Sequence, residues 1–370
     1  MSDVPHLRFP EFSGEWKKVR LGDNCNIQMC KRIMAAQTNT DRGVPFFKIG
    51  TIGGKADAYI SKELFDEYKA KYPFPHKGEV MITCAGTVGK CIIYNGKDSY
   101  YQDSNIVWID NPNEIISNDF LYHLLCKVNW SHLNSTTIVR IYNDDLRNLK
   151  LYIPQHDEQK KITHLLSLIN ERIATQNKII EELKKLKSVI TDLLFNSIID
   201  AHTIRLGNIA HITNGVGDVQ DANIEHIENW YPFFDRSEEL KWFPTYSFDK
   251  EAVIYAGEGQ SFYPRYYKGK FALHQRCYAI TDFASCILPK YCYYFMSTLN
   301  SYFVRNSVGS TVSSLRMDIF QKAEIKLPPI PKQQHICKII DAFCTKLEVE
   351  QSIISTLQEL KQFLLSQMFI

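Results

Sequence analysis

Basic and aromatic side chains alternate over residues 264–270 of this chain, "PRYYKGK", in a pattern that suits binding to a polyanion. Arg265, Lys268 and Lys270 stand beside Tyr266 and a second tyrosine. Positive charge next to aromatic surface on a tight loop favours contact with the phosphate backbone of a nucleic acid. The same composition also fits the solvated tip of a β-hairpin, so the segment alone leaves both interpretations open.

Other polar side chains could hydrogen-bond to the edges of bases. Gln275 and Arg276 follow at the expected start of the next strand. Sequence-specific contacts in the major groove use Arg, Lys, Asn and Gln, because these side chains can make two hydrogen bonds to one base. The candidates in the N-terminal half are Lys31, Arg32, Lys90, Gln102 and Asn105. Lys90 suits a phosphate contact, and the last two occupy a place like that of Gln275.

No arrangement of residues predicts catalysis. An adenine methyltransferase would need an Asn/Asp-Pro-Pro-aromatic motif, and neither "NPN" at 111–113 nor "LPPIP" at 327–331 fits it. The nearest match to a cofactor-binding glycine turn is Gly257 and Gly259, which a hairpin turn explains better because the helix that should follow is interrupted. No P-loop occurs. We therefore expect no catalytic residue and no cofactor.

The ten cysteines include no CxxC pair, which favours reduced thiols in a cytoplasmic protein over disulfides or a metal site. Asp144 and Asp145 fit the first turn of a helix better than a metal site. No apolar run approaches the roughly 18 residues of a membrane span, and the N-terminus lacks an apolar secretion signal. The formal net charge of +2 argues against nucleic-acid binding through overall basicity, but local patches or a partner could supply the contacts.

An internal repeat organises the chain. Residues 151–173, "LYIPQHDEQKKITHLLSLINERI", align without a gap on 325–347, "IKLPPIPKQQHICKIIDAFCTKL", and pair Gln159 with Gln333 (333 − 159 = 174). Upstream, "VRLGDNCNI" resembles "IRLGNIAHI" at an offset of 185, so the first repeat holds about eleven extra residues in between. The sequence therefore predicts a mixed α/β globular unit and a long helix, both present twice.

The two long helices carry apolar residues at alternating steps of four and three, which is the spacing of a coiled-coil seam. Neither helix would be stable with this stripe exposed, and the simplest partner for each is the other. Gln176 and Glu350 are polar residues at the same place in each seam, where they either fix the register or are a solvent-exposed accident. The expected seam consists of Ile162, Leu166, Ile169, Ile173, Ile180, Leu183, Ile336, Ile340, Phe343, Leu347, Ile354 and Leu357.

The order of these parts predicts an α+β fold in which two similar α/β domains are joined by two long antiparallel coiled-coil helices. The first helix leads from the first domain to the second, so a second helix packed along it must run back. The domains would then lie at the two ends of a spacer about 60 Å long, related by a pseudo-twofold axis. Duplex DNA is the commonest ligand read through two half-sites, and two dissimilar domains should read dissimilar halves.

These motifs together resemble the specificity subunit of a type I restriction–modification enzyme. The resemblance covers essentially the whole chain. It is carried by the opening "LRFPEFSGEWKKVRLGD", the helix starts "IP…EQKKI" and "PPIPKQQHI", and the two "ST…L…I.LP" segments at 135–154 and 309–328. Gln155, His156 and Lys332 depart from the usual helix start, which affects the cap and at most the docking surface.

The resemblance implies two target recognition domains, at 1–154 and 200–328, each reading one half of a bipartite, asymmetric site in double-stranded DNA. Spacer helices at 155–199 and 329–370 would set the gap between the halves. Two adenine-methylating modification subunits would bring S-adenosylmethionine, and restriction subunits would add an ATP-driven translocase with nuclease activity. The chain itself would be non-catalytic.

Two other functions stay open at this point. A methyltransferase or endonuclease in its own right would show activity as the purified chain, and the missing motifs argue against it. A two-headed protein–protein adaptor would use the coiled coil as a dock and would show no sequence-dependent binding to duplex DNA.

Overall fold

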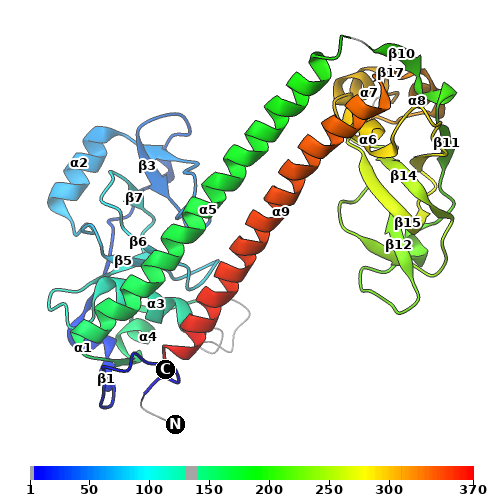
Figure 1. Ribbon diagram of the computed structural model, residues 1–370. Coiled ribbons are helices and arrows are strands. Elements are labelled where there is room, and N and C mark those ends of the chain that lie inside the picture. Colours follow the sequence, from blue (N-terminus) through cyan, green and yellow to red (C-terminus); the bar gives the residue numbers. More distant parts are fainter. Residues whose placement is uncertain (1–3, 131–139, 200, 310) are drawn as a thin grey trace. The chain divides into compact units, whose positions relative to one another are not determined.

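The computed structural model describes residues 4–130, 140–199, 201–309 and 311–370 (Figure 1). Residues 135–139 and 310, which belong to the expected segments before the long helices, lie outside the described residues. The same holds for residue 200, the expected start of the second recognition domain.

The chain divides into two compact units. The first unit comprises residues 1–176 and 353–370, and the second unit comprises residues 177–352. Each unit therefore combines a globular α/β domain with parts of both long helices, α5 (His156–Asn196) and α9 (Ile330–Gln367).

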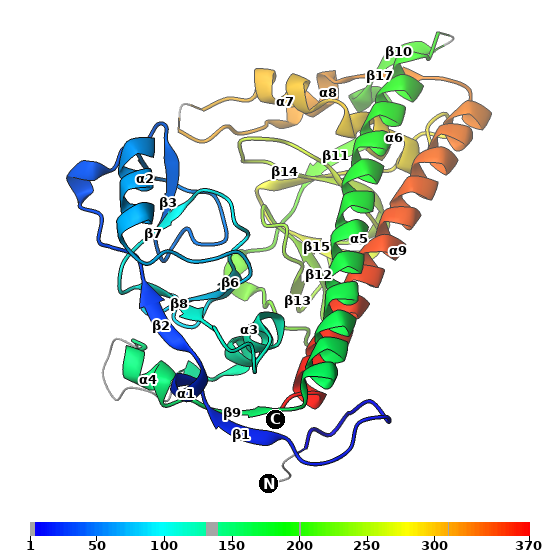
Figure 2. The same ribbon diagram turned by 90° about the vertical axis from the view of Figure 1, so that its left-hand side faces the viewer.

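Short strands in small sheets form the first unit (Figure 2). Its strands are β1 (Lys17–Arg20), β2 (Asn26–Met29), β3 (Val44–Phe47), β4 (Tyr59–Ile60), β5 (Val80–Thr83), β6 (Cys91–Ile93), β7 (Tyr100–Tyr101), β8 (Ile106–Asp110) and β9 (Lys150–Ile153). Its shorter helices are α1 (Leu21–Asn24), the 3-10 helix η1 (Ala35–Gln37), α2 (Lys62–Lys71), α3 (Asn118–Lys127) and α4 (Asn143–Arg147). The sheets have the orders β2-β8-β5-β6, β4-β3-β7 and β1-β9.

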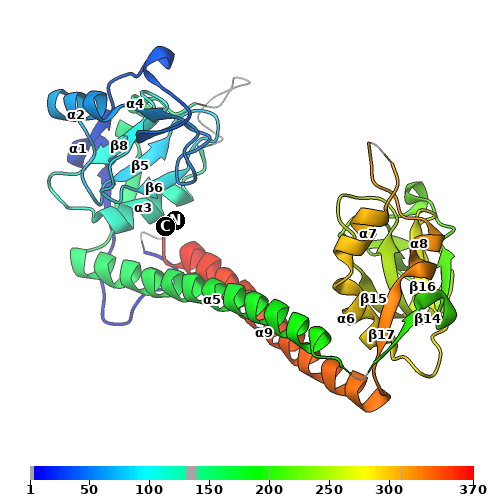
Figure 3. The same cartoon turned by 90° about the horizontal axis from the view of Figure 1, so that it is seen from above.

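The second unit is built around one larger sheet (Figure 3). Its strands are β10 (His202–Arg205), β11 (His211–Asn214), β12 (Tyr231–Phe234), β13 (Lys241–Phe243), β14 (Phe248–Ala256), β15 (Arg265–Leu273), β16 (Cys277–Thr281) and β17 (Glu324–Leu327). Its shorter helices are η3 (Leu206–Asn208), η4 (Val219–Asp221), α6 (Pro289–Ser297), α7 (Asn300–Asn306) and α8 (Met317–Lys322). The main sheet has the order β11-β16-β14-β15-β12-β13, and β10 pairs with β17.

The strand pairing confirms the internal repeat. β1 pairs antiparallel with β9, just as β10 pairs with β17. β3 and β7 run parallel with Phe46 opposite Tyr100, and β12 and β15 run parallel with Phe233 opposite Ala272. The antiparallel set β2-β8-β5 corresponds in the same way to β11-β16-β14.

Most elements expected from the sequence are present. Apolar runs closed by glycine predict strands in "GEVMITCAG" and "KCIIYNG", and these segments contain β5 and β6. Apolar residues at helical spacing predict two helices with starts at Asn118 and Pro289, and both helices begin there. The second of these is two helices, α6 and α7, instead of one. Ser297 and Thr298 end α6, since their hydroxyls donate back to helix carbonyls at 2.6 and 2.7 Å.

The extra residues of the first repeat form a helix. The pairing registers place Ile60 and Val80 at the positions of Phe243 and Val253. Between them the first unit has residues 61–79 where the second has only 244–252. The longer segment contains α2, whose first turn is capped by the Ser61 hydroxyl (3.1 Å to the Leu64 amide).

The long helices complete the core of each globular domain. In the first unit, Ile162 and Leu166 from the start of α5 share one apolar cluster with Leu364 from the end of α9 and with Phe369, which follows that helix. In the second unit, Phe195 from the end of α5 lies in the same cluster as the start of α9. Each domain core therefore combines one end of α5 with the opposite end of α9.

A buried glutamine marks the start of each long helix. Gln159 is 1% exposed and Gln333 is 0% exposed. The Gln159 Oε1 accepts the Ser117 amide (2.8 Å), while its Nε2 donates to the carbonyls of Ile115 and Pro154 (both 3.0 Å).

Gln333 makes the same three hydrogen bonds in the second unit. It accepts the Leu288 amide at 2.9 Å and donates to the carbonyls of Cys286 and Pro328, both at 2.8 Å. Each glutamine thus joins three segments of its unit: the loop before the short helix, the N-cap residue of that helix, and the proline between the last strand and the long helix.

We predict that Gln159→Leu and Gln333→Leu each lower the free energy of unfolding by about 2–4 kcal/mol, because several buried backbone groups lose their partners. Chemical denaturation followed by circular dichroism measures this loss. Gln155→Leu and Gln334→Leu are matched controls on exposed neighbouring positions, where the expected change is within about 0.5 kcal/mol. Equal losses in all four variants would contradict the role given to the buried pair.

Candidate nucleic-acid interface

The prediction of a tight loop at residues 264–270 is wrong, because most of this segment belongs to the strand β15. β15 pairs antiparallel with β14 from Ile254↔Arg265 to Phe248↔Phe271. Tyr267 and Phe271 lie on one face of the strand and pack with Phe234 at ring-centroid distances of 5.2 and 5.8 Å. Aromatic packing on alternate residues stabilises an extended strand here instead of a loop.

Arg265, one of the expected phosphate contacts, is engaged inside the second unit. Its guanidinium donates to the backbone carbonyls of Ser237 (2.8 Å) and Asp235, and it lies over the Phe234 ring at 5.5 Å. Burial lowers the pKa of Arg265 below its usual value. These contacts tie β15 to the loop after β12, so the main effect of Arg265 is structural.

The other basic residues of β15 are more accessible. Lys268 is exposed, and its Nζ lies 3.9 Å from Oε2 of Glu251. The other oxygen of this carboxylate, Oε1, accepts a hydrogen bond from the Tyr266 hydroxyl. Burial, followed by this hydrogen bond, raises the pKa of Tyr266 well above its usual range. Lys270 is exposed and stacks over the Tyr246 ring at 4.7 Å. Lys268 and Lys270 therefore stay available as phosphate contacts.

Gln275 and Arg276 lie in a turn between β15 and β16 instead of at the start of a strand. Both side chains are exposed and line a hollow of about 600 Å³. Arg276 makes an ion pair with Glu258 at 2.9 Å. Other polar residues on the wall are Asp218, Gln220, Asp235, Arg236, Ser237, Lys241 and His274.

Gln102 and Asn105 occupy the equivalent turn of the first unit, between β7 and β8. The Gln102 amide donates to the Phe47 carbonyl (2.9 Å), as the His274 amide does to Phe234 (2.9 Å). The Asn105 carbonyl accepts the Cys84 amide at 2.7 Å, and the Arg276 carbonyl accepts the Gly257 amide at 2.9 Å. The structure thus aligns Gln102 with His274 and Asn105 with Arg276, which refines the sequence-based match of both to Gln275.

Three lysine and arginine candidates of the first unit differ in availability. Lys90 donates from Nζ to the Ile52 carbonyl at 2.6 Å, so its ammonium joins two loops. Arg32 is exposed and lies 3.6 Å from Asp103 in the β7–β8 turn. Lys31 is exposed and lies over the Tyr72 ring at 5.2 Å. Of these three residues, Arg32 is joined by an ion pair to the turn that carries Gln102 and Asn105.

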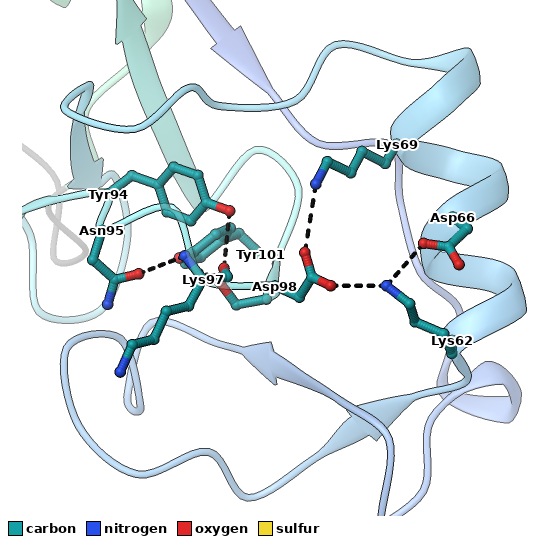
Figure 4. A network of polar contacts seen from close by, with 9 residues as sticks. Lys62, Asp66, Lys69, Tyr94, Asn95, Lys97, Asp98 and Tyr101 are labelled. Carbon is teal, nitrogen blue, oxygen red and sulfur yellow. Dashed lines mark hydrogen bonds and ion pairs between the residues drawn. The ribbon is translucent and has the colours of Figure 1, made fainter.

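The α2 helix adds lysines that sequence reasoning did not single out (Figure 4). Asp98 lies between Lys62 (2.8 Å) and Lys69 (3.5 Å), and Asp66 makes a second ion pair with Lys62. The hydrogen bond from Lys62, followed by the positive charges of Lys62 and Lys69, keeps the pKa of Asp98 below its usual value. The carboxylates of Asp66 and Asp98 largely neutralise Lys62 and Lys69. These two lysines are therefore weaker candidates for phosphate contacts than unpaired lysines would be.

The expected seam residues are all shielded from solvent. Seven of the twelve are buried and five are partly buried. Gln176 and Glu350 are buried as well, and Glu350 makes an ion pair with Lys346 one turn earlier. Burial of the stripe supports helix pairing, which stays a prediction over the full length of the helices.

Within the described ranges there is no cluster of three metal-ligating side chains, and no helix has the length and apolarity needed to cross a membrane. All ten cysteines are free thiols. Gly257 and Gly259 lie in the turn after β14, where the Gly257 amide bonds to the Arg276 carbonyl. The hairpin interpretation of these glycines therefore fits the structure better than a cofactor turn.

Comparison with known proteins assigns the fold to a family. A family model described as "Type I restriction modification DNA specificity domain" matches the chain twice, over residues 13–185 and 199–359. The crystal structure of the S subunit of a type I restriction–modification system from M. genitalium matches with a TM-score of 0.63 and 16% identity, over 99% of each chain. This chain belongs to the family of type I restriction–modification DNA specificity proteins.

Relatives in sequence carry matching descriptions. A putative type I restriction enzyme specificity subunit of Haemophilus influenzae, S.HindORF215P, is 44% identical over 184 residues, covering 49% of this chain and 48% of the relative. The specificity subunit of the EcoDI enzyme of Escherichia coli is 28% identical over 166 residues, covering 45% of this chain and 36% of the relative. The matched region spans half or less of the length of these curated relatives.

We predict that Arg265→Leu lowers the free energy of unfolding by about 2 kcal/mol, because two loop carbonyls lose a charged donor. Lys268→Leu, three positions along the same strand, is the matched control and should change it by less than about 0.5 kcal/mol. Urea denaturation followed by tryptophan fluorescence measures both. Equal stabilities of the two variants would contradict a structural role for Arg265.

Proposed function

We propose that this chain is the DNA sequence-recognition subunit of a type I restriction–modification complex. Each globular domain reads one half of a bipartite, asymmetric site in double-stranded DNA. The single observation that carries the proposal is the duplication itself. The same strand pairing, the same buried glutamine and the same turn beside the sheet occur once in each unit, with different side chains at the turn.

The proposed boundaries follow the start of each long helix. Residues 1–154 and 200–328 form the recognition domains, and residues 155–199 and 329–370 form spacer helices that pair antiparallel along their length. Two observations support this pairing: opposite ends of the two helices share one apolar cluster in each unit, and the seam is buried. A helix of 41 residues is about 60 Å long, enough to hold two readers apart by more than one turn of DNA.

The partners follow from the family. Two modification subunits, which bind S-adenosylmethionine and methylate adenine, dock on the spacer and the recognition domains, and restriction subunits complete the complex. Apolar residues exposed on the long helices support a protein dock there: Leu168, Leu186, Val189, Leu193, Val349, Leu360 and Phe363. The chain contributes recognition and no catalysis, and its free thiols suit the cytoplasm.

The first test is methylome sequencing of cells with and without this gene, expressed together with its modification subunit. A bipartite adenine-methylated motif should be present in the first case and absent in the second. Expression of the modification subunit alone is the control. Methylation of the same motif without this chain, or a motif without two separated halves, would contradict the proposal.

The second test changes the length of the spacer. Seven residues inserted in phase into both α5 and α9 should lengthen the gap by up to about three base pairs, because they add about 10.5 Å and DNA rises about 3.4 Å per base pair. Both half-sites should stay the same. Five residues inserted into both helices break the seam repeat and should abolish methylation. Altered half-sites with an unchanged gap would contradict a spacer role.

A further inference from the structure

We propose that Arg276, positioned by Glu258, selects a guanine in the half-site read by the second unit. This inference rests on the proposed function, because it names the residue that carries part of that recognition. It starts from the turn between β15 and β16, which presents polar side chains over a hollow of about 600 Å³.

The backbone of this turn is held from both sides. The Gln275 amide donates to the Gly217 carbonyl at 3.1 Å, and the Arg276 carbonyl accepts the Gly257 amide at 2.9 Å. A Cβ atom at Gly257 would collide with the Arg276 carbonyl oxygen, so the close approach of the two segments requires glycine. Backbone hydrogen bonds within the unit thus hold the turn in place without a ligand, as a base-reading element requires.

The guanidinium of Arg276 is both accessible and oriented. Its side chain is 66% exposed, while that of Glu258 is only 24% exposed. Glu258 accepts a hydrogen bond from Nη1 at 2.9 Å, which fixes the direction of the planar group. A guanidinium has five donors, so those that Glu258 does not use can make the paired hydrogen bonds to O6 and N7 of guanine.

The charges around the hollow favour a base edge over a phosphate. Three carboxylates on its wall accompany three positive groups: Asp218, Asp235 and Glu258 against Arg236, Lys241 and Arg276. Two opposed pairs are already joined, since Lys241 lies 2.6 Å from Asp235 and Arg276 lies 2.9 Å from Glu258. A surface with balanced charge attracts the phosphate backbone weakly but can pair with the donors and acceptors of a base pair.

The first unit has a different side chain at the same place. Asn105 aligns with Arg276 through the backbone hydrogen bonds of the two turns, and an amide pairs with adenine instead of guanine. The two recognition domains thus present different chemistry on the same scaffold. Asn105 provides an internal reference, because its substitution should affect the opposite half-site.

The test compares methylation motifs of cells that express the modification subunit with this chain or with its variants. Arg276→Ala should keep the gap and the other half-site, and should reduce the preference for guanine at one position by on the order of 10- to 100-fold. Arg276→Gln should shift that position toward adenine. Glu258→Gln should weaken the guanine preference by a smaller factor. The double variant Glu258→Gln, Arg276→Ala should have the same base preference as Arg276→Ala alone, because Glu258 acts through Arg276.

Controls separate base reading from other roles. Lys268→Ala removes a candidate phosphate contact from β15. It can lower the extent of methylation but should leave every motif position unchanged, because phosphate contacts carry no sequence information. Asn105→Ala should relax one position in the other half-site only. If Arg276→Ala gives no methylation at all, the motif of Arg276→Gln, which keeps a hydrogen-bonding side chain at this position, decides whether Arg276 reads a base.

The outcomes distinguish the two levels of the proposal. A bipartite motif in the unaltered protein that stays identical in Arg276→Gln and Glu258→Gln would overturn the guanine assignment and leave the proposed function intact. A uniform loss of methylation without a change of motif would show Arg276 to be a phosphate contact and would also overturn the assignment. Absence of any bipartite motif in the unaltered protein would overturn both.

Discussion

Both globular domains depend on one hydrogen-bonding arrangement, in which a buried glutamine holds the point where a strand becomes a long helix. Gln159 and Gln333 each satisfy one amide and two carbonyls that would otherwise be buried without partners. The arrangement fixes the direction in which each long helix leaves its domain. A misplaced start would displace every apolar residue of the stripe that follows, because the stripe has a fixed spacing.

The constraint at the helix start leaves other parts of the repeat free to diverge. The first unit has Glu158 at the position of Lys332, and there a buried carboxylate receives two hydrogen bonds from Arg8, both at 2.7 Å. The first unit also contains α2, for which the second has only a short connection. Differences of this kind lie in the ends and loops around a common scaffold, which is where recognition can change without loss of the fold.

Much of the architecture could be predicted from the sequence because it depends on spacing. The gap-free alignment of Gln159 with Gln333 identified the repeat, and helix starts at Asn118 and Pro289 were correct. The environment of single polar residues could not be predicted in this way. Arg265 was expected on a loop and lies on a strand with its guanidinium bound to two carbonyls, because the partners come from residues about 30 positions away. No local signal marks such a contact.

Glu258 could not be identified from the sequence for the same reason, because its partner is distant along the chain. It stands in "GEG", a segment that sequence patterns interpret as a turn, and its relation to Arg276 exists only because β14 and β16 pair side by side. Ion pairs of this kind are also consistent with the low formal net charge, +2, of a chain for which we propose DNA recognition. A carboxylate beside a base-reading arginine orients the guanidinium but weakens its attraction to phosphate. The arrangement therefore lowers general affinity for DNA and raises specificity for sequence. In the proposed complex, partner subunits supply much of the hold on DNA. This chain can then accept such a balance of charge, because its proposed contribution is to discriminate between sequences.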